Sequence, residues 1–181
     1  MMLDNADMKW FAMRATYGRN LMAQRLLEVL KVESFVPMRK LTTKVGRRIK
    51  TDHIPIVRDL IFVLGERETI QEVKSKIGYL HYITRPAEGR NMPIEVPVDQ
   101  MEQFMAVCND MDDRVDFLTG EEASFEVGEK VRIIGGAFKG CEGRLVKIEG
   151  KRSKRFVVSI EGVIAVSVSG IKAEALERIE N

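Results

Sequence analysis

The sequence is poor in the residues that build metal centres and disulfide frameworks. Its 181 residues include two cysteines, two histidines and one tryptophan. Cys108 and Cys141 lie in separate segments, and neither His53 nor His81 has a Cys, Asp or Glu at the spacing of a metal-ligand motif. These absences argue against a disulfide-bonded secreted protein and against a zinc site, and they favour a reduced, cytoplasmic protein.

Long apolar runs and catalytic signatures are also missing. No run approaches the ~20 apolar residues of a transmembrane helix, and residues 1–9 carry acids without the apolar core of a signal peptide. No phosphate loop ending in Gly-Lys-Ser/Thr occurs, and no nucleophile motif frames the Ser, His and Asp residues. With 45% hydrophobic and 31% charged residues, we expect a soluble, globular protein that is not an enzyme and needs no cofactor.

Charge is nearly balanced, at a formal net +2, but it is unevenly distributed. Residues 39–52 hold six basic residues and one acid, residues 110–126 hold seven acids and one arginine, and residues 139–155 hold seven basic residues and two acids. This order indicates two modules that each meet a polyanion or an acidic surface, separated by an acidic connector. Each run taken alone is explained as well by a solvated loop.

The first part of the chain has the pattern of an α+β domain, residues 8–110. Strands are expected in four apolar segments: 9–16, 35–38, 59–64 and 80–84. Helices are expected in three segments: 20–31, 69–76 and 99–108. The third strand is the most apolar and therefore central, and residues 45–48 form the tip of a basic hairpin. The order predicts an antiparallel sheet flanked by helices.

Two of these helices carry apolar stripes that should pack on the sheet. In the first helix the stripe consists of Met22, Leu26, Val29 and Leu30, at i, i+4, i+7 and i+8. In the last helix it consists of Met101, Phe104, Met105 and Cys108. Both stripes have the helical period. Asn20 and Asp99 are the expected N-caps.

The second part of the chain changes character. Residues 111–124 are acidic and lack periodicity, which predicts a linker. Residues 125–181 are rich in Val, Ile and Gly and form short alternating runs, which is typical of a small β-barrel. A barrel of about 55 residues has a thin core, so a binding module is favoured over an enzyme.

Within this second part, the segments 127–133, 136–140 and 143–146 together resemble the KOW motif. Phe138, Lys139 and Gly140 lie at the expected loop tip, where an aromatic residue beside a basic one suits a stacking or docking contact. Phe138 would serve equally well as a plug at the end of the barrel. The motif does not choose between RNA-binding, ribosomal and polymerase-associated proteins.

The first part resembles the NusG N-terminal (NGN) domain. The residues that carry this resemblance are Lys9-Trp10-Phe11, Phe35-Val36-Pro37, Ile61-Phe62-Val63 and the helix start from Pro97 to Met101, together with the basic hairpin. An NGN domain followed by a KOW barrel is the arrangement of the NusG family of transcription elongation factors. Where that family often has Phe-Pro-Gly/Asn-Tyr, this chain reads Val57-Arg58-Asp59-Leu60, which favours the specialised RfaH- or UpxY-like branch.

The resemblance implies that the first domain docks an apolar patch on the clamp of the largest RNA polymerase subunit. Carried over by position, the patch consists of Trp10, Val57, Leu60, Phe62 and Tyr82. An apolar patch rimmed by charge is typical of a protein–protein site. Trp10 would serve as a core anchor at its edge. Core packing is an equal alternative for Leu60 and Phe62, because strand residues alternate between faces.

The resemblance also implies an approach to the non-template DNA strand. Polar and basic residues at the expected positions are Arg19, Asn20, Lys74 and Lys76, and the hairpin tip adds Arg47 and Arg48. Attraction to phosphates would make such binding sensitive to salt. Ordinary solvated helix charges explain the same residues.

The function implied by the resemblance is suppression of pausing or termination by a monomer that bridges the polymerase cleft, in operons for surface polysaccharides. The KOW barrel would recruit a ribosomal protein or Rho. Its β-branched residues favour the barrel over a helical hairpin as the resting form. The alternative is an RNA-binding or ribosome-associated KOW protein that acts without polymerase.

Overall fold

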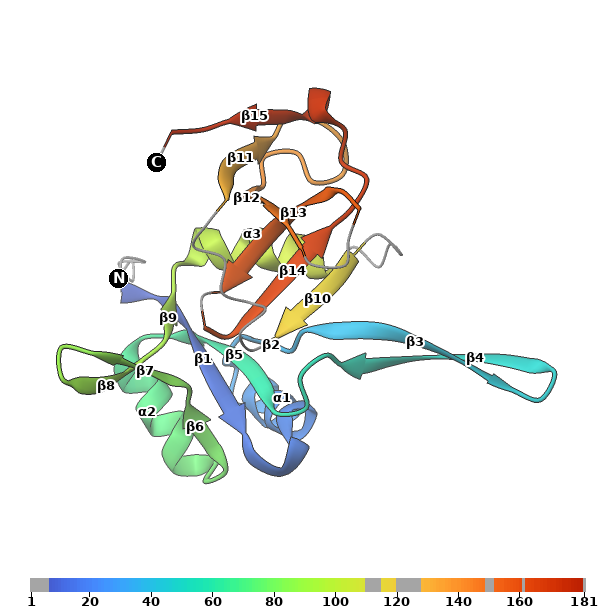
Figure 1. Ribbon diagram of the computed structural model, residues 1–181. Coiled ribbons are helices and arrows are strands. Elements are labelled where there is room, and N and C mark those ends of the chain that lie inside the picture. Colours follow the sequence, from blue (N-terminus) through green and yellow to red (C-terminus); the bar gives the residue numbers. More distant parts are fainter. Residues whose placement is uncertain (1–6, 110–114, 120–127, 149–151, 161, 181) are drawn as a thin grey trace. The chain divides into compact units, whose positions relative to one another are not determined.

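The computed structural model describes residues 7–109, 115–119, 128–148, 152–160 and 162–180 (Figure 1). The fold is mixed α+β with antiparallel sheets, as predicted. The chain divides into two compact units, residues 1–101 and 102–181. The division falls inside the last helix, whereas the predicted first domain extends to residue 110. In the described part of the chain, no helix is long and apolar enough to cross a membrane.

The N-terminal unit is built on a five-stranded sheet. Its strands are β1 (Lys9–Ala15), β2 (Ser34–Phe35), β5 (Leu60–Gly65), β6 (Leu80–Tyr82) and β9 (Glu95–Val96). β5 runs along one side of β1, and β6 and β9 lie end to end along the other side. β5, the predicted central strand, is flanked by β2 and β1. The predicted strand at 80–84 is divided between β6 and the start of β7.

Two hairpins extend from this sheet. One consists of β3 (Met38–Val45) and β4 (Arg48–Pro55), and the other of β7 (Thr84–Ala87) and β8 (Arg90–Pro93). The second leaves the sheet edge between Ile83 and Ile94. There Ile83 N donates to Ala12 O at 2.9 Å, Ala12 N donates to Ile94 O at 3.0 Å, and Ile94 N donates to Ile83 O at 2.9 Å. These hydrogen bonds continue the pairing along the sheet edge at the base of the hairpin.

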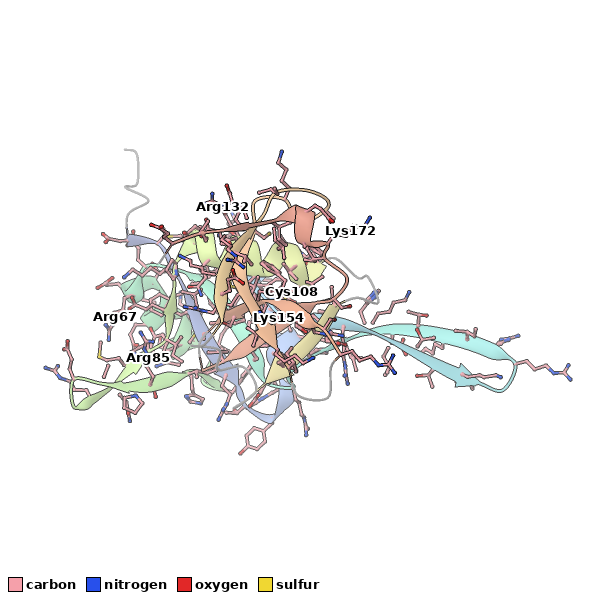
Figure 2. The ribbon with its side chains drawn as sticks, turned by 45° about the horizontal axis from the view of Figure 1, so that its top comes forward. Arg67, Arg85, Cys108, Arg132, Lys154 and Lys172 are labelled. Atoms are coloured by element: carbon pink, nitrogen blue, oxygen red, sulfur yellow. The ribbon has the colours of Figure 1, made fainter. Side chains whose placement is uncertain are left out.

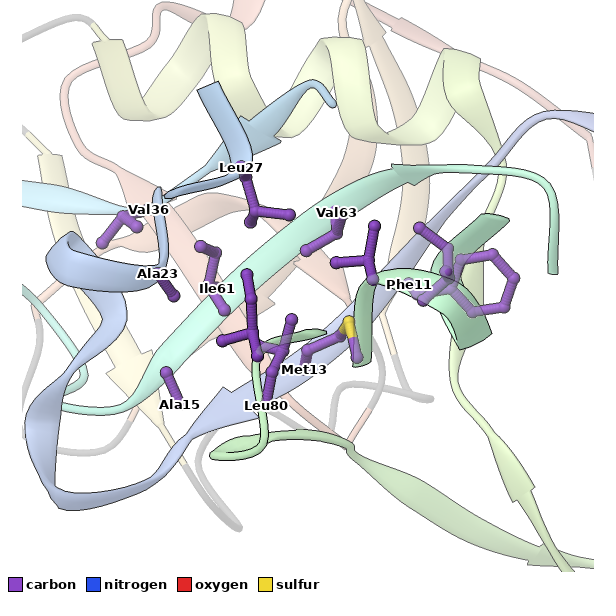
Figure 3. Packing of buried hydrophobic residues seen from close by; sticks show 12 residues of the cluster. Phe11, Met13, Ala15, Ala23, Leu27, Val36, Ile61, Val63 and Leu80 are labelled. Carbon is purple, nitrogen blue, oxygen red and sulfur yellow. The ribbon is translucent and has the colours of Figure 1, made fainter. Parts of the chain in front are cut away.

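The described residues contain three α-helices that flank the sheet or follow it in the chain: α1 (Asn20–Val29), α2 (Arg67–Lys76) and α3 (Val98–Asn109), with a 3-10 turn η2 (Thr16–Gly18) before α1. The core on one face of the sheet contains residues of β1, β5, α1 and α2, including Phe11, Met13, Ile61, Leu27 and Ile70 (Figure 3). Alternate residues of a strand share a face. The even-numbered residues of β1 and β5 therefore lie on the opposite face.

The face of α1 that packs on the sheet is not the predicted one. Asn20, Ala23 and Leu27 are buried. The predicted stripe is exposed instead: Met22, Leu26, Val29 and Leu30 are 54%, 43%, 78% and 37% exposed. Ala23 and Leu27 belong to the core cluster on this face of the sheet. In α3, by contrast, Met101, Phe104 and Cys108 are buried as predicted, while Met105 is half-buried.

The C-terminal unit contains one six-stranded antiparallel sheet in the order β10-β14-β13-β12-β11-β15. Its strands are β10 (Val115–Thr119), β11 (Glu129–Ile133), β12 (Glu142–Lys147), β13 (Lys154–Ile160), β14 (Ile164–Val168) and β15 (Leu176–Arg178), with a 3-10 turn η4 (Ala173–Ala175) before β15. This β-rich unit agrees with the predicted KOW-type domain. Its β-branched segments form strands, as their composition predicts.

β10 corrects the predicted linker, because residues 115–119 pair with β14 from Val115↔Val168 to Thr119↔Ile164. Apolar residues in this segment alternate with an acid, Asp116, whose carboxylate is paired with Arg155 of β13. The acidic composition hid this strand pattern. The rest of the predicted linker, the start of the predicted barrel at 125 and the first residue of the KOW segment at 127 lie outside the described residues.

Candidate functional site

The five residues predicted to contact polymerase do not form one patch. Three of them are buried: Trp10, Leu60 and Phe62 are 1%, 2% and 0% exposed. Leu60 and Phe62 are therefore core residues, which was the alternative to a role in the patch. Phe62 pairs with Ala12 and Tyr82 pairs with Met13. Because neighbouring residues of β1 point to opposite faces, Phe62 and Tyr82 lie on opposite faces of the sheet. Strand register, which the sequence did not reveal, separates them.

Val57 is half-buried in the segment before β5. Its carbonyl oxygen accepts a hydrogen bond from Asn20 Nδ2 at 3.2 Å. Its backbone therefore helps to hold α1, while part of its side chain is accessible. Of the predicted patch, Val57 and Tyr82 are the partly accessible members.

Tyr82 packs in an aromatic and basic environment. The centroid of its ring lies 5.6 Å from the centroid of the Phe11 ring. Lys74 Nζ lies 4.3 Å from the centroid of the Tyr82 ring. Burial raises the pKa of the Tyr82 hydroxyl above its usual value, with Glu95 and Glu68 raising it further and Arg67 opposing them. Lys74, predicted to contact nucleic acid, is half-buried over this ring, whereas Lys76 at the end of α2 is exposed.

Asn20, also predicted to contact nucleic acid, is 1% exposed. Its Nδ2 donates to the carbonyl oxygens of Val57 and Leu60 at 3.2 and 3.1 Å. Its Oδ1 accepts from the amide of Leu21 at 3.0 Å. Asn20 is the first residue of α1 rather than its N-cap, which is Arg19. The side chain therefore connects the start of α1 to Val57 and to Leu60 of β5 by hydrogen bonds. Because it is buried, it is not available to a ligand.

Arg19, just before α1, lies near two aromatic rings. Its guanidinium carbon lies 3.9 Å from the ring centroid of Tyr79 and 5.3 Å from that of Tyr17. Its Nε also donates to Thr16 O at 2.9 Å. These contacts fix the direction of the guanidinium group, which favours recognition of a planar or anionic ligand.

Tyr17 is the most exposed large hydrophobic side chain among the described residues, at 84%. Its φ of 62° places it in the left-handed region, where a non-glycine residue is strained. Next to it, a Cβ on Gly18 would lie 2.7 Å from Arg58 Nε, so the Arg58 side chain lies across the turn. We name Tyr17, Arg19, Arg58 and Tyr79 the aromatic–arginine cluster.

Sequence reasoning found one member of this cluster, Arg19, and missed the other three. The succession Tyr17-Gly18-Arg19 was a usable signal, because glycine beside an aromatic residue permits a turn that displays the ring. Arg58 and Tyr79 come from segments about 40 and 60 residues further along the chain, where only the fold brings them to the turn.

The predicted basic hairpin is present as β3 and β4. Its tip residues Arg47 and Arg48 are exposed, and Figure 2 shows side chains standing along both edges of the ribbon. In the C-terminal unit several basic side chains bind within the unit. Arg144 Nη1 donates to Gly128 O at 2.9 Å, Lys147 Nζ donates to Arg152 O at 2.6 Å, and Arg155 is paired with Asp116. The hairpin is therefore the stronger candidate for a polyanion.

The KOW loop does not display Phe138. Its side chain is only 7% exposed. This burial agrees with the alternative that Phe138 packs inward at the end of the barrel. Cys141 N donates to Phe138 O at 3.0 Å and Gly140 N donates to Ile133 O at 2.7 Å, which folds the loop back on β11. Lys139 and Gly140 are exposed, as predicted. Ile134 is the large apolar side chain that this loop exposes, at 47%.

Among comparisons with known proteins, one family model matches the chain. The protein-family model described as "Transcription termination factor nusG" matches residues 8–105, more than half of the chain. No curated protein matches the sequence. A solved structure titled "Domain interaction in Thermotoga maritima NusG" is similar with a TM-score of 0.45 and 19% sequence identity, over 97% of this chain and 99% of that chain.

Proposed function

The chain belongs to the NusG family of transcription factors, and on this premise we propose that it binds RNA polymerase and suppresses pausing or termination in particular operons. The observation that carries the proposal is the family match, which begins just before β1 and ends within α3. The matched segment therefore includes the whole five-stranded sheet and the two hairpins. Long operons for surface polysaccharides are the targets that we propose.

The proposed mechanism uses binding energy alone. The N-terminal unit bridges the two sides of the polymerase cleft and favours the closed clamp. A ligand that binds one state of an equilibrium more tightly shifts the population toward that state. Closing the clamp around nucleic acid lowers the population of the paused state without any chemical step.

We propose the aromatic–arginine cluster as the contact with the exposed non-template DNA strand. Single-stranded nucleic acid is held by aromatic rings on which bases stack and by cations that follow the backbone. Tyr17 offers an accessible ring, and Arg19 is oriented beside it. Lys76 on α2 is a further exposed cation of this unit. This assignment replaces Asn20, which is buried.

In the C-terminal unit we propose that the loop from Ile134 to Gly140 binds a second protein, either a ribosomal protein or Rho. Its exposed residues include Ile134 and Lys139, an apolar and a basic side chain on a turn fixed by backbone hydrogen bonds. A small apolar contact with a charged rim suits a transient protein partner.

Co-purification of the full chain with core RNA polymerase tests the proposal. We expect the wild-type protein to bind and Val57→Glu to bind at least about ten-fold more weakly, since a carboxylate would enter a desolvated apolar contact. Val29→Glu is the matched control, because Val29 is 78% exposed on α1, outside the predicted patch. A wild-type chain that does not bind polymerase would overturn the proposal. RNA binding by that chain would favour the alternative of a KOW protein that acts without polymerase.

A further inference from the structure

The hairpin of β3 and β4 forms a two-stranded sheet of its own. Eight residue pairs join its strands, from Met38↔Pro55 at the base to Val45↔Arg48 beside the tip. At ~3.4 Å per residue, each arm is about 27 Å long. Every residue from 39 to 51 is exposed. A two-stranded ribbon that lacks a buried face is marginally stable in water, so this one is suited to ordering against a partner.

The charge of the ribbon restricts the chemistry of that partner. Residues 39–52 carry six basic side chains and one acid. The acid, Asp52, is paired with Lys50 at 3.0 Å. A concentration of positive charge on an exposed element attracts a polyanion and repels basic surfaces.

The register separates this charge between two faces of different character. Residues directly opposite each other in an antiparallel pair share a face, and successive residues alternate. One face carries Lys40, Thr42 and Lys44 from β3 with Ile49, Thr51 and His53 from β4. The other carries Arg39, Leu41, Thr43 and Val45 with Arg48, Lys50, Asp52 and Ile54. We name the first the acid-free face, since the only acid of the ribbon lies on the other.

We propose that the hairpin binds duplex DNA by entering the major groove with its acid-free face toward the base edges. The major groove of B-form DNA is about 12 Å wide and admits a two-stranded β-ribbon. Lysine donates to the O6 and N7 acceptors of guanine, and threonine pairs with several bases. Lys40, Lys44 and the central pair Thr42↔Thr51 therefore match the chemistry of the groove floor.

The opposite face and the tip supply the contacts to the backbone. Arg39, Arg47 and Arg48 are exposed and can reach the phosphates that rim the groove. Duplex RNA is a poor partner for the same ribbon, because its major groove is deep and too narrow for side chains to read. The hairpin site is separate from the aromatic–arginine cluster, and the proposed binding of duplex DNA needs no polymerase. If the hairpin does not bind duplex DNA, the proposed function in transcription still stands.

The first test is fluorescence anisotropy of the full-length protein with a labelled DNA duplex of about 30 base pairs at low salt, beside an RNA duplex of the same sequence. We expect the DNA duplex to bind at least about ten-fold more tightly than the RNA duplex. Lys40→Ala with Lys44→Ala should weaken DNA binding at least about ten-fold, because the variant loses two donors to the base edges.

The matched control is Arg25→Ala with Lys172→Ala, which removes the same charge from exposed positions outside the hairpin. We expect this variant to bind DNA as the wild type does. Equal binding of DNA and RNA duplexes, or an equal loss in the control variant, would overturn the proposal. All four positions are exposed, and unchanged far-UV circular dichroism and Trp10 fluorescence would verify that both variants are folded.

The second test locates the groove. Dimethyl sulfate methylates guanine N7 in the major groove and adenine N3 in the minor groove. At saturating wild-type protein we expect guanine N7 to be protected and adenine N3 to remain reactive, because these acceptors lie in different grooves. The Lys40→Ala, Lys44→Ala variant should lose the N7 protection at the same concentration. Protection of adenine N3 alone, or reactive guanine N7 in a saturated duplex, would contradict major-groove binding.

Discussion

The side-chain amide of Asn20 donates to the carbonyl oxygen of Leu60, 3.1 Å away and 40 residues later in the chain. The same amide serves Val57 O at 3.2 Å. We expect Asn20→Ala to lower the free energy of unfolding of the N-terminal unit by about 2 kcal/mol, because it removes the side-chain hydrogen bonds to the carbonyl oxygens of Val57 and Leu60. Trp10, the single tryptophan, is buried in this unit, so its fluorescence in a urea titration reports the loss.

Asn91→Ala is the control for this measurement. Asn91 is exposed in β8, and removal of a solvated amide changes stability by less than about 0.5 kcal/mol. If the two variants unfold at the same urea concentration, the buried amide does not hold α1 to the sheet.

Gly143 lies where two strands of the C-terminal sheet approach closely. A Cβ there would lie 2.4 Å from Val157 O and 2.8 Å from Phe156 Cζ. We expect Gly143→Ala to destabilise the C-terminal unit by about 1–3 kcal/mol, since the sheet must shift to admit the methyl group. Far-UV circular dichroism during urea unfolding measures the change. Gly135→Ala, with nothing within 4 Å of its added Cβ, should leave stability unchanged, and equal effects would refute the steric argument.

Buried thiols predict a pH dependence of stability. Burial raises the pKa of the Cys108 thiol above its ordinary 9.0. The folded protein therefore keeps this proton where the unfolded chain loses it. The stabilising contribution is complete below about pH 9 and is lost as the pH rises further, by up to about 1.4 kcal/mol per pH unit.

Urea titrations between about pH 8 and 11 would measure this loss. In Cys108→Ala the decline above pH 9 should be shallower than in the wild type, although the cavity lowers stability at every pH. A decline of identical slope in the variant would show that other groups cause it.

The strained backbone of Tyr17 allows its stacking role to be tested without unfolding the protein. Glycine adopts a φ of 62° freely, so we expect Tyr17→Gly to change stability by less than about 1 kcal/mol. Its affinity for single-stranded DNA should fall about ten-fold, because a stacked base contributes ~1–3 kcal/mol. Tyr17→Phe should bind as the wild type does. Unchanged affinity in Tyr17→Gly would remove the ring from the proposed site.

The sequence was sufficient to predict the α+β class, three helices near their observed positions and a β-rich C-terminal unit. Periodicity identified α1 as a helix but selected the wrong face. The four larger apolar residues of the predicted stripe make a stronger helical pattern than Ala23 and Leu27. Asn20 is polar, so the pattern gave no reason to expect it on the buried face. Its burial depends on carbonyl groups 37 and 40 residues away, which no local pattern contains.

The candidate site was less predictable than the fold. The family resemblance, carried over by position, predicts Phe62 and Tyr82 in one patch, yet their pairing with Ala12 and Met13 places them on opposite faces of the sheet. One residue of register decides this, and the chain gives no signal for it. Phe138 lies in a loop of the predicted kind but turns inward. The basic hairpin, by contrast, was visible directly from its charge.

The hydrogen bonds among Ala12, Ile83 and Ile94 have an evolutionary consequence. They complete the sheet edge at the base of the β7–β8 hairpin, so the length and content of residues 84–93 can vary without disturbing the strands behind them. Segments whose ends meet on the surface are where chains accept insertions. A descendant of this protein can gain a recognition loop or a whole extra domain at this position, or shed the hairpin, while the sheet that identifies its family persists.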